Sequence, residues 1–276
     1  MRSLLLVPLA GALAVFAAEP LAIVKPVISQ MEEGAPNAPG FYYTPGEILF
    51  FTCRMAHFAK TADLKMRIAY TVQAFDPKDV ALAEPYKNEF EDEVTVEDKE
   101  WMPRIQTQIL IPPLAGSGNY KIVVKAEDLV GKTAAQLDVP FEVRGRTVEP
   151  SDTVIVRNFH FYHDEGGKQP DEKAVYHAGE TMWARFDVIG YKFGDGNKVD
   201  VSYLASIMLP NGTVVWTQPE PAGETSESFY PKRYISGEFS INLQAGVRPG
   251  SYIVGLQVKD AIGNQTYTSR HPFSVE

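Results

Sequence analysis

Cysteine is nearly absent from this chain, since Cys53 is the single cysteine among 276 residues. One thiol cannot form a disulfide within the chain, and it cannot supply the sulfur ligands of a cysteine-rich zinc site or an iron–sulfur cluster. Cys53 lies in an alternating apolar segment. We therefore expect a packed core side chain there rather than a reactive thiol.

Positive charge is also scarce. The chain carries 26 Lys and Arg against 35 Asp and Glu, a formal net charge of −9, and it has no basic run. Such a protein is a poor candidate for binding nucleic acid or an anionic membrane surface. Hydrophobic residues make up 45% and charged residues 22%, which is typical of a globular protein and excludes a disordered one. The length suggests two domains or one large domain.

Catalytic signatures are missing as well. There is no Gly-x-Ser-x-Gly, no His-Glu-x-x-His, no phosphate-binding glycine loop and no Gly-x-Gly-x-x-Gly between a strand and a helix. No stretch of 12 residues has the apolar spacing of an amphipathic helix. We predict a protein that is not an enzyme, with no catalytic residue, no cofactor and no metal ion.

Residues 1–18 have the pattern of a secretory signal peptide. Arg2 precedes an apolar stretch over residues 3–16, and Val15 and Ala17 suit the −3 and −1 positions of a cleavage after Ala17, with cleavage after Ala18 as the alternative. A membrane anchor is the competing interpretation, but this stretch is shorter than the roughly 20 residues that span a bilayer. No cysteine follows for lipid attachment. We expect an extracytoplasmic protein, periplasmic or secreted, without an integral membrane segment after cleavage.

The rest of the chain contains one pattern twice, first at an offset of 133 residues and later at 132. The matching segments are residues 43–47 (YTPGE) with 176–180 (YHAGE), 118–124 with 250–256, 128–131 (DLVG) with 260–263 (DAIG), and 140–143 (PFEV) with 272–275 (PFSV). A single one-residue deletion accounts for the change of offset. We interpret the pattern as an internal duplication.

Each copy consists of short alternating runs separated by turn signals, as in residues 106–111, 121–125 and 252–258. This pattern predicts an all-β protein with two tandem antiparallel sandwiches. We place the first domain at residues 19–146 and the second at residues 147–276. The linker, residues 144–151, is short, polar and stiffened by Pro150, so we expect two sandwiches end to end with limited bending.

The end of each copy has a characteristic hairpin: Gly-x-Tyr opens a strand, Asp-x-x-Gly turns it, and Pro-Phe-x-Val closes it. These hairpins resemble the last two strands of bacterial immunoglobulin-like and fibronectin type III-like domains. The resemblance covers about 30 residues of each copy and implies a binding, spacer or adhesive module. It brings no catalytic residue, and neither copy has the cysteine pair of antibody domains. It also suggests that Tyr120 and Tyr252 are structural tyrosines whose hydroxyls hold a neighbouring loop.

Three polar groups are candidates for metal binding. His160 and His163 precede Asp164 and Glu165, but residues 160 and 163 of a strand point to opposite faces, and the first copy has only Glu32 and Glu33 before Gly34. Asp128 and Asp260 could bind calcium, yet the turn explains them without metal. Residues 84–100 hold eight carboxylates without a calcium-loop motif, so we expect a solvated acidic loop there.

Aromatic residues and possible glycosylation sites complete the candidates. Tyr42, Tyr43, Trp183, Trp216, Phe229 and Tyr230 would bind sugar if they formed an exposed row, but their alternation favours core positions. Asn211 and Asn264 begin sequons that matter only in a eukaryotic source.

Two hypotheses for function remain. The first is a non-catalytic binding or spacer protein with an unknown protein or glycan partner. The second is a carbohydrate-binding or accessory subunit of a secreted hydrolase. A carboxylate pair in a cleft would favour the second.

Overall fold

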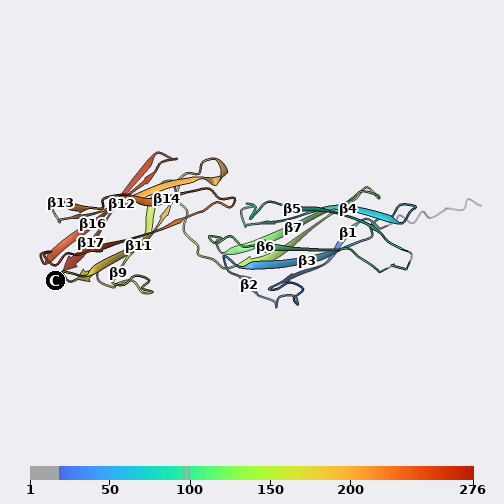
Figure 1. The fold of residues 1–276 in the computed structure, drawn as a ribbon, viewed down its shortest axis with the longest axis horizontal. Coiled ribbons are helices and arrows are strands. Elements are labelled where there is room, and N and C mark those ends of the chain that lie inside the picture. Colours follow the sequence, from blue (N-terminus) through green and yellow to red (C-terminus); the bar gives the residue numbers. More distant parts are fainter. Residues whose placement is uncertain (1–18, 96, 99) are drawn as a thin grey trace, which may run out of the picture.

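The computed structural model describes residues 19–95, 97–98 and 100–276; the predicted signal peptide lies outside them. This part of the chain is nearly all β, so the prediction of an all-β protein is confirmed. Two β-rich halves lie end to end along the long axis of the molecule (Figure 1). The one helix among the described residues is a single 3₁₀ turn, Asp195–Asn197. None of the described helices could therefore cross a membrane.

The first half contains eight strands in two sheets. The strands are β1 (Ala22–Ser29), β2 (Tyr42–Tyr43), β3 (Ile48–Ala56), β4 (Lys65–Phe75), β5 (Tyr86–Glu93), β6 (Arg104–Leu110), β7 (Gly118–Asp128) and β8 (Thr133–Val143). One sheet has the order β1-β3-β6 and the other the order β2-β8-β7-β4-β5. Neighbours are antiparallel except β2 and β8, which are parallel.

The second half repeats this arrangement with one additional strand. Its strands are β9 (Ile155–Tyr162), β10 (Val175–Tyr176), β11 (Thr181–Ile189), β12 (Val199–Met208), β13 (Val214–Thr217), β14 (Ala222–Ser226), β15 (Ile235–Asn242), β16 (Gly250–Asp260) and β17 (Gln265–Val275). The sheets have the orders β15-β11-β9 and β10-β17-β16-β12-β13, and β14 also pairs with β12.

The strand registers confirm the internal repeat. Ile68 of β4 faces Asp128 of β7, and Val201 of β12 faces Asp260 of β16, so the offset is 133 in one strand and 132 in its neighbour. The missing residue therefore falls between β4 and β6, where β5 is replaced by the shorter β13 and β14.

The shared Tyr-x-x-Gly-Glu motif forms a tight turn before β3 and before β11. Gly46 and Gly179 have φ of 90° and 94°, a conformation that favours glycine. The Glu47 carboxylate accepts the Thr44 N–H at 2.6 Å, and the Glu180 carboxylate accepts the His177 N–H at 2.7 Å. The motif is thus explained by the turn, with no ligand needed.

Each half has its own apolar core between its two sheets. In β4 every second side chain is buried, from Met66 to Ala74, as alternation requires for a strand with one face on the core. The two cores use different residues at one matching position. Cys53 on β3 faces Ile105 on β6, whereas Phe186 on β11 faces Gly237 on β15.

Candidate functional site

Cys53 is a core residue, as expected. Its side chain is 1% exposed, and burial raises the pKa of the thiol to about 12. A thiol that stays protonated at neutral pH is a poor nucleophile and a poor metal ligand.

The histidines after the first strand of the second half do not converge. His160 is exposed on β9 opposite Arg185, whereas His163 forms an ion pair with Asp171 at 2.9 Å and stacks on the Tyr176 ring. The Tyr176 hydroxyl donates to the same Asp171 at 2.7 Å. Asp171 therefore fastens the loop between β9 and β10. Within the described ranges, no group of three or more His, Cys, Asp or Glu side chains could hold a metal ion.

The turn that matches this loop in the first half is shifted by one residue from the sequence prediction. The Gly34 N–H donates to the Met31 carbonyl, and the Gly167 N–H donates to the Asp164 carbonyl. Gly34 therefore corresponds to Gly167 rather than to Gly166, and the carboxylates of the two turns do not all match.

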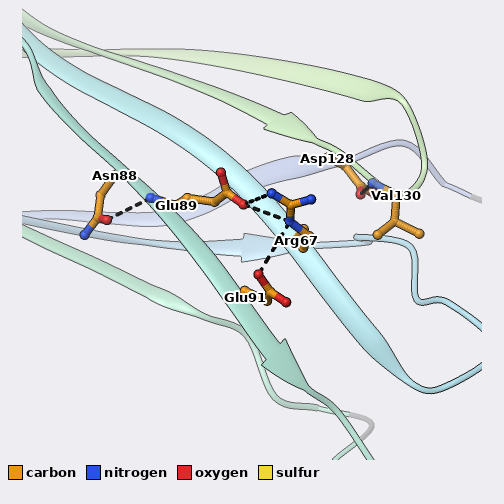
Figure 2. Close-up of polar contacts among 6 residues, drawn as sticks. All are labelled: Arg67, Asn88, Glu89, Glu91, Asp128 and Val130. Carbon is orange, nitrogen blue, oxygen red and sulfur yellow. Dashed lines mark hydrogen bonds and ion pairs between the residues drawn. The ribbon is translucent and has the colours of Figure 1, made fainter.

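Asp128 and Asp260 are buried, and each fastens two loops through backbone N–H groups. One oxygen of Asp128 accepts from Val130 and Gly131, both at 2.9 Å, and the other accepts from Ala59 at 2.6 Å; Figure 2 shows the Val130 contact. Asp260 repeats the pattern with the N–H groups of Ile262, Gly263 and Lys192. Their carboxylate oxygens are thus used in structural bonds.

The acidic segment at residues 84–100 was predicted to be a loop, and for residues 86–93 this was wrong. Residues 86–93 form β5, an edge strand on β4. Figure 2 shows Arg67 of β4 between Glu89, at 2.5 Å, and Glu91, at 3.7 Å. Phe90 stacks on Tyr70 and holds the other face to the core. An edge strand needs only one apolar face, so many carboxylates fit on it and discourage pairing with other chains.

Tyr120 and Tyr252 make the predicted structural contact. Each hydroxyl donates to the carbonyl oxygen four residues earlier, Gly116 or Arg248, at 2.8 Å. Tyr120 is 2% exposed, whereas Tyr252 is only partly buried. The same residue with the same hydrogen bond thus has two environments, and the difference lies in what covers it.

The six aromatic candidates divide between core and surface. Tyr43 and Tyr230 are buried, Trp183 and Trp216 are partly buried, and Tyr42 and Phe229 are exposed. Core positions were predicted for most of them, and Tyr42 and Phe229 depart from that prediction.

Tyr230 is the residue that covers Tyr120. It comes from the second half, between β14 and β15, but it belongs to the core cluster of the first half. Its hydroxyl donates to Asp76 at 2.9 Å, and Arg233 donates to the same carboxylate oxygen at 2.5 Å. The other oxygen of Asp76 accepts the N–H groups of Lys78 and Val80. Burial and the nearby Tyr230 raise the pKa of Tyr120.

The linker is fastened to the second half. Arg146 forms a two-pronged ion pair with Asp187, one contact of which is 2.8 Å, and Asp187 is 2% exposed. Asn158 donates to Asp187 at 2.7 Å. A cleft of about 200 Å³ remains at the junction, lined by side chains of both halves and of the linker. These contacts agree with limited bending between the halves.

The strongest candidate for a binding site is a pocket of about 580 Å³ at the opposite end of the second half. It lies between the end of β12 with β13 on one side and the end of β15 with the following loop on the other. It is lined by Ile207, Leu209, Val215, Trp216, Ser240, Ile241, Asn242, Leu243, Gln244, Val247, Tyr252 and Phe273. The lining is mainly apolar, and Val214 and Val215 at its edge are 54% and 52% exposed. We call it the open-end pocket.

The open-end pocket lies at the end of the second half that corresponds to the junction end of the first half. The turn at residues 209–213 matches the turn at residues 76–80, because the Leu209 and Asp76 N–H groups donate to the carbonyls of Thr213 and Val80. Tyr252 matches Tyr120. At the junction end of the first half, Tyr230 covers Asp76 and Tyr120, and Leu82 is only 4% exposed. At the free end of the second half, the matching residues Leu209 and Tyr252 border the pocket.

Sequence reasoning identified Trp216 and Tyr252 but did not place them together. The pocket also depends on Leu209 and Val247, which carried no signal as single residues. A comparison of the two copies contained one usable signal, because Leu209 stands where the first copy has the charged Asp76.

No family model matches this chain. No curated protein sequence matches it either. Among solved structures, it is similar to the C-terminal domain of the AgI/II polypeptide BspA of Streptococcus agalactiae, with 9% identity, a TM-score of 0.33, and coverage of 91% of this chain and 100% of that chain. It is also similar to the C-terminal domain of the antigen I/II-family protein AspA of Streptococcus pyogenes, with 10% identity, a TM-score of 0.32, and coverage of 92% and 99%. Such TM-scores do not establish a shared fold.

Proposed function

We propose that this chain is a non-catalytic, extracytoplasmic binding protein, and that the open-end pocket receives an apolar side chain of a protein partner. The observation that carries the proposal is the pocket itself. It has a volume of about 580 Å³, an apolar lining and exposed valines at its edge. Exposed apolar surface of this kind marks interaction sites in soluble proteins.

The polar candidates elsewhere support a binding role rather than catalysis. Asp76, Asp128, Asp187 and Asp260 are buried carboxylates, and each is occupied by backbone N–H groups or by a side chain that holds two segments together. A catalytic carboxylate needs a free oxygen in reach of a substrate. These residues stabilise the scaffold that presents the pocket.

The strand order supports the immunoglobulin-like interpretation as part of this proposal. In the first half, β1, β3 and β6 form one sheet, and β2, β8, β7, β4 and β5 form the other. Immunoglobulin-type sandwiches divide their strands in a similar way, with the first, second and fifth main strands opposite the third, sixth and seventh. We propose residues 19–146 and 147–276 as the two domains.

The test is photocrosslinking from the pocket. Benzoylphenylalanine replaces Val215 in the full chain, and the protein is irradiated in its native envelope or medium. We expect a crosslinked protein partner that disappears when Leu209→Asp puts a charge into the pocket. The same photoreactive group at Tyr42, which is exposed elsewhere, is the matched control.

Two results would contradict the proposal. A crosslinked protein that is unaffected by Leu209→Asp, or obtained equally from position 42, would show that the pocket is not the binding site. If the protein binds glycans on an array, loses that binding when Trp216 is replaced, and gives no protein crosslink, the carbohydrate-binding alternative is supported instead.

A further inference from the structure

We propose that the partner in the open-end pocket is a second copy of this chain, bound head to tail through Trp101 of its first half. This inference rests on the proposed function of the pocket, and it adds the identity of the partner. The reason is that the molecule already contains one such contact, between its own two halves.

The contact inside the chain has a defined direction. β14 runs antiparallel to β12 and ends opposite Val199, the first residue of β12, so the segment from β14 to β15 lies at the end of the second half away from the open-end pocket. This segment carries Tyr230 and Arg233 and lies on the junction end of the first half, at Asp76 and Tyr120.

The first half has a segment in the same position. β5 ends at Glu93 opposite Lys65, the first residue of β4, so the connection from β5 to β6 lies at the end of the first half away from the junction. Trp101 in this connection is 39% exposed. The β5–β6 connection, which corresponds to the segment with Tyr230 and Arg233, therefore lies at one end of the elongated molecule. The open-end pocket, which corresponds to the surface that this segment contacts, lies at the other end (Figure 1).

The register identifies Trp101 as the counterpart of Arg233. The Met55 N–H donates to the Pro103 carbonyl, and Val188, the counterpart of Met55, pairs with Ile235. Residue 103 thus matches 235, and residue 101 matches 233. At the junction, Arg233 binds Asp76; at the two free ends, the corresponding residues are Trp101 and Leu209. Both members of the pair have changed together from charged to apolar, as expected if Trp101 packs on Leu209.

The charges around the two free ends also agree. Asp98 and Glu100 come shortly before Trp101, and both are exposed. Arg248, on the loop whose carbonyl holds Tyr252, is exposed beside the pocket. Opposite charges at the rim favour this orientation over contact between two identical ends. Because the contact joins different surfaces of the two copies, it can be repeated and gives open chains rather than a closed dimer.

The experiment is sedimentation velocity of the chain from residue 19 over a range of concentrations. We expect association that grows with concentration beyond the dimer. Trp101→Ala and Leu209→Asp should each weaken it by about tenfold or more. The control Tyr42→Ala removes an exposed aromatic ring elsewhere and should leave association unchanged.

A double variant makes the test specific to this pair of residues. Leu209→Asp combined with Trp101→Arg rebuilds between two copies the ion pair that Asp76 and Arg233 make at the junction. We expect it to restore association that Leu209→Asp alone removes. Circular dichroism of each variant establishes that it remains folded.

A chain that stays monomeric at every concentration, or associates equally well in both single variants, would overturn the head-to-tail inference. The proposed function would survive that result if benzoylphenylalanine at position 215 still captured a different protein. Failure of both experiments would remove the pocket as a binding site altogether.

Discussion

At the scale of single residues, the two halves separate the energetic contribution of a side chain from that of its surroundings. Tyr120 and Tyr252 occupy the same position and make the same hydrogen bond, but only Tyr120 is covered by a neighbouring half. The difference in stability lost when each tyrosine is replaced by alanine therefore measures the effect of burial.

We expect Tyr120→Ala to lower the free energy of unfolding by about 3–5 kcal/mol, because it removes a buried ring and leaves a cavity. Tyr252→Ala should cost clearly less, since part of that ring is already in water. Tyr120→Phe removes only the hydrogen bond to Gly116 and should cost about 1 kcal/mol. Urea melts measure all three. Equal losses for the two alanine variants would contradict the role assigned to Tyr230 as a cover.

His271 is expected to make stability depend on pH. It stacks on Phe159 with ring centroids 3.5 Å apart, and burial lowers its pKa from 6.5 to about 4. The unfolded chain therefore binds more protons than the folded chain between these values. The contribution is complete above about pH 6.5 and is lost as the pH falls towards 4, by up to about 3 kcal/mol.

The measurement is the unfolding free energy at pH 7 and pH 4.5 for the wild type, His271→Gln and His160→Gln. The loss on acidification should be smaller in His271→Gln than in the wild type. His160 is exposed, so His160→Gln should behave as the wild type does. If the unfolding free energy of His271→Gln falls with pH as it does in the wild type, His271 is not the source of the pH dependence.

At the scale of strands, matching positions in the duplicated cores are filled by different pairs. A Cβ on Gly237 would lie 2.4 Å from the Phe186 ring, so the ring needs a glycine on the neighbouring strand. In the first half the smaller Cys53 leaves room for Ile105. The same core volume is thus filled by Cys and Ile in the first half and by Phe and Gly in the second.

This exchange predicts a compensating double substitution. Phe186→Cys should cost about 3–5 kcal/mol through a cavity, and Gly237→Ile should be destabilising through overlap with the ring. The double variant copies the pair of the first half and should recover at least about 2 kcal/mol relative to the sum of the single changes. Additive costs in urea melts would show that the two cores are not equivalent at this position.

Strand patterns also explain how far the sequence could predict the structure. Alternation, turn residues and the repeat were sufficient to predict an all-β chain and the matching hairpins, because these depend on neighbours in sequence. The acidic β5 was missed because an edge strand needs only Phe90 and Tyr86 on its inner face. The open-end pocket was missed because it depends on Leu209 and Val247 meeting Tyr252 across the fold.

At the scale of the whole molecule, the junction determines whether the halves behave as one body. One carboxylate oxygen of Asp76 accepts hydrogen bonds from Tyr230 and Arg233. The other accepts backbone N–H groups of its own turn. Tyr230 and Arg233 come 154 and 157 residues after Asp76, so these hydrogen bonds join distant parts of the chain. A substitution that weakens only the first oxygen should loosen the junction and leave the turn intact.

Asp76→Asn is that substitution, and we expect it to cost about 1–3 kcal/mol of coupling between the halves. Residues 19–146 and 150–276 should each unfold cooperatively when expressed alone. In the variant, the two transitions of the full chain should shift towards those of the separate halves in urea melts followed by circular dichroism. A half that is unfolded alone would mean that the junction is obligatory for folding.

The strand directions have a consequence for mechanical strength. β17 pairs with β16 over 11 residues, and the strands run roughly along the long axis of the molecule (Figure 1). Ladder hydrogen bonds lie perpendicular to the strands, so tension between β1 and β17 loads the whole ladder in shear instead of breaking it one bond at a time. We expect single-molecule pulling along this axis to require a higher force than pulling across it, through residues 211 and 276. A tether that transmits force along its length needs that property.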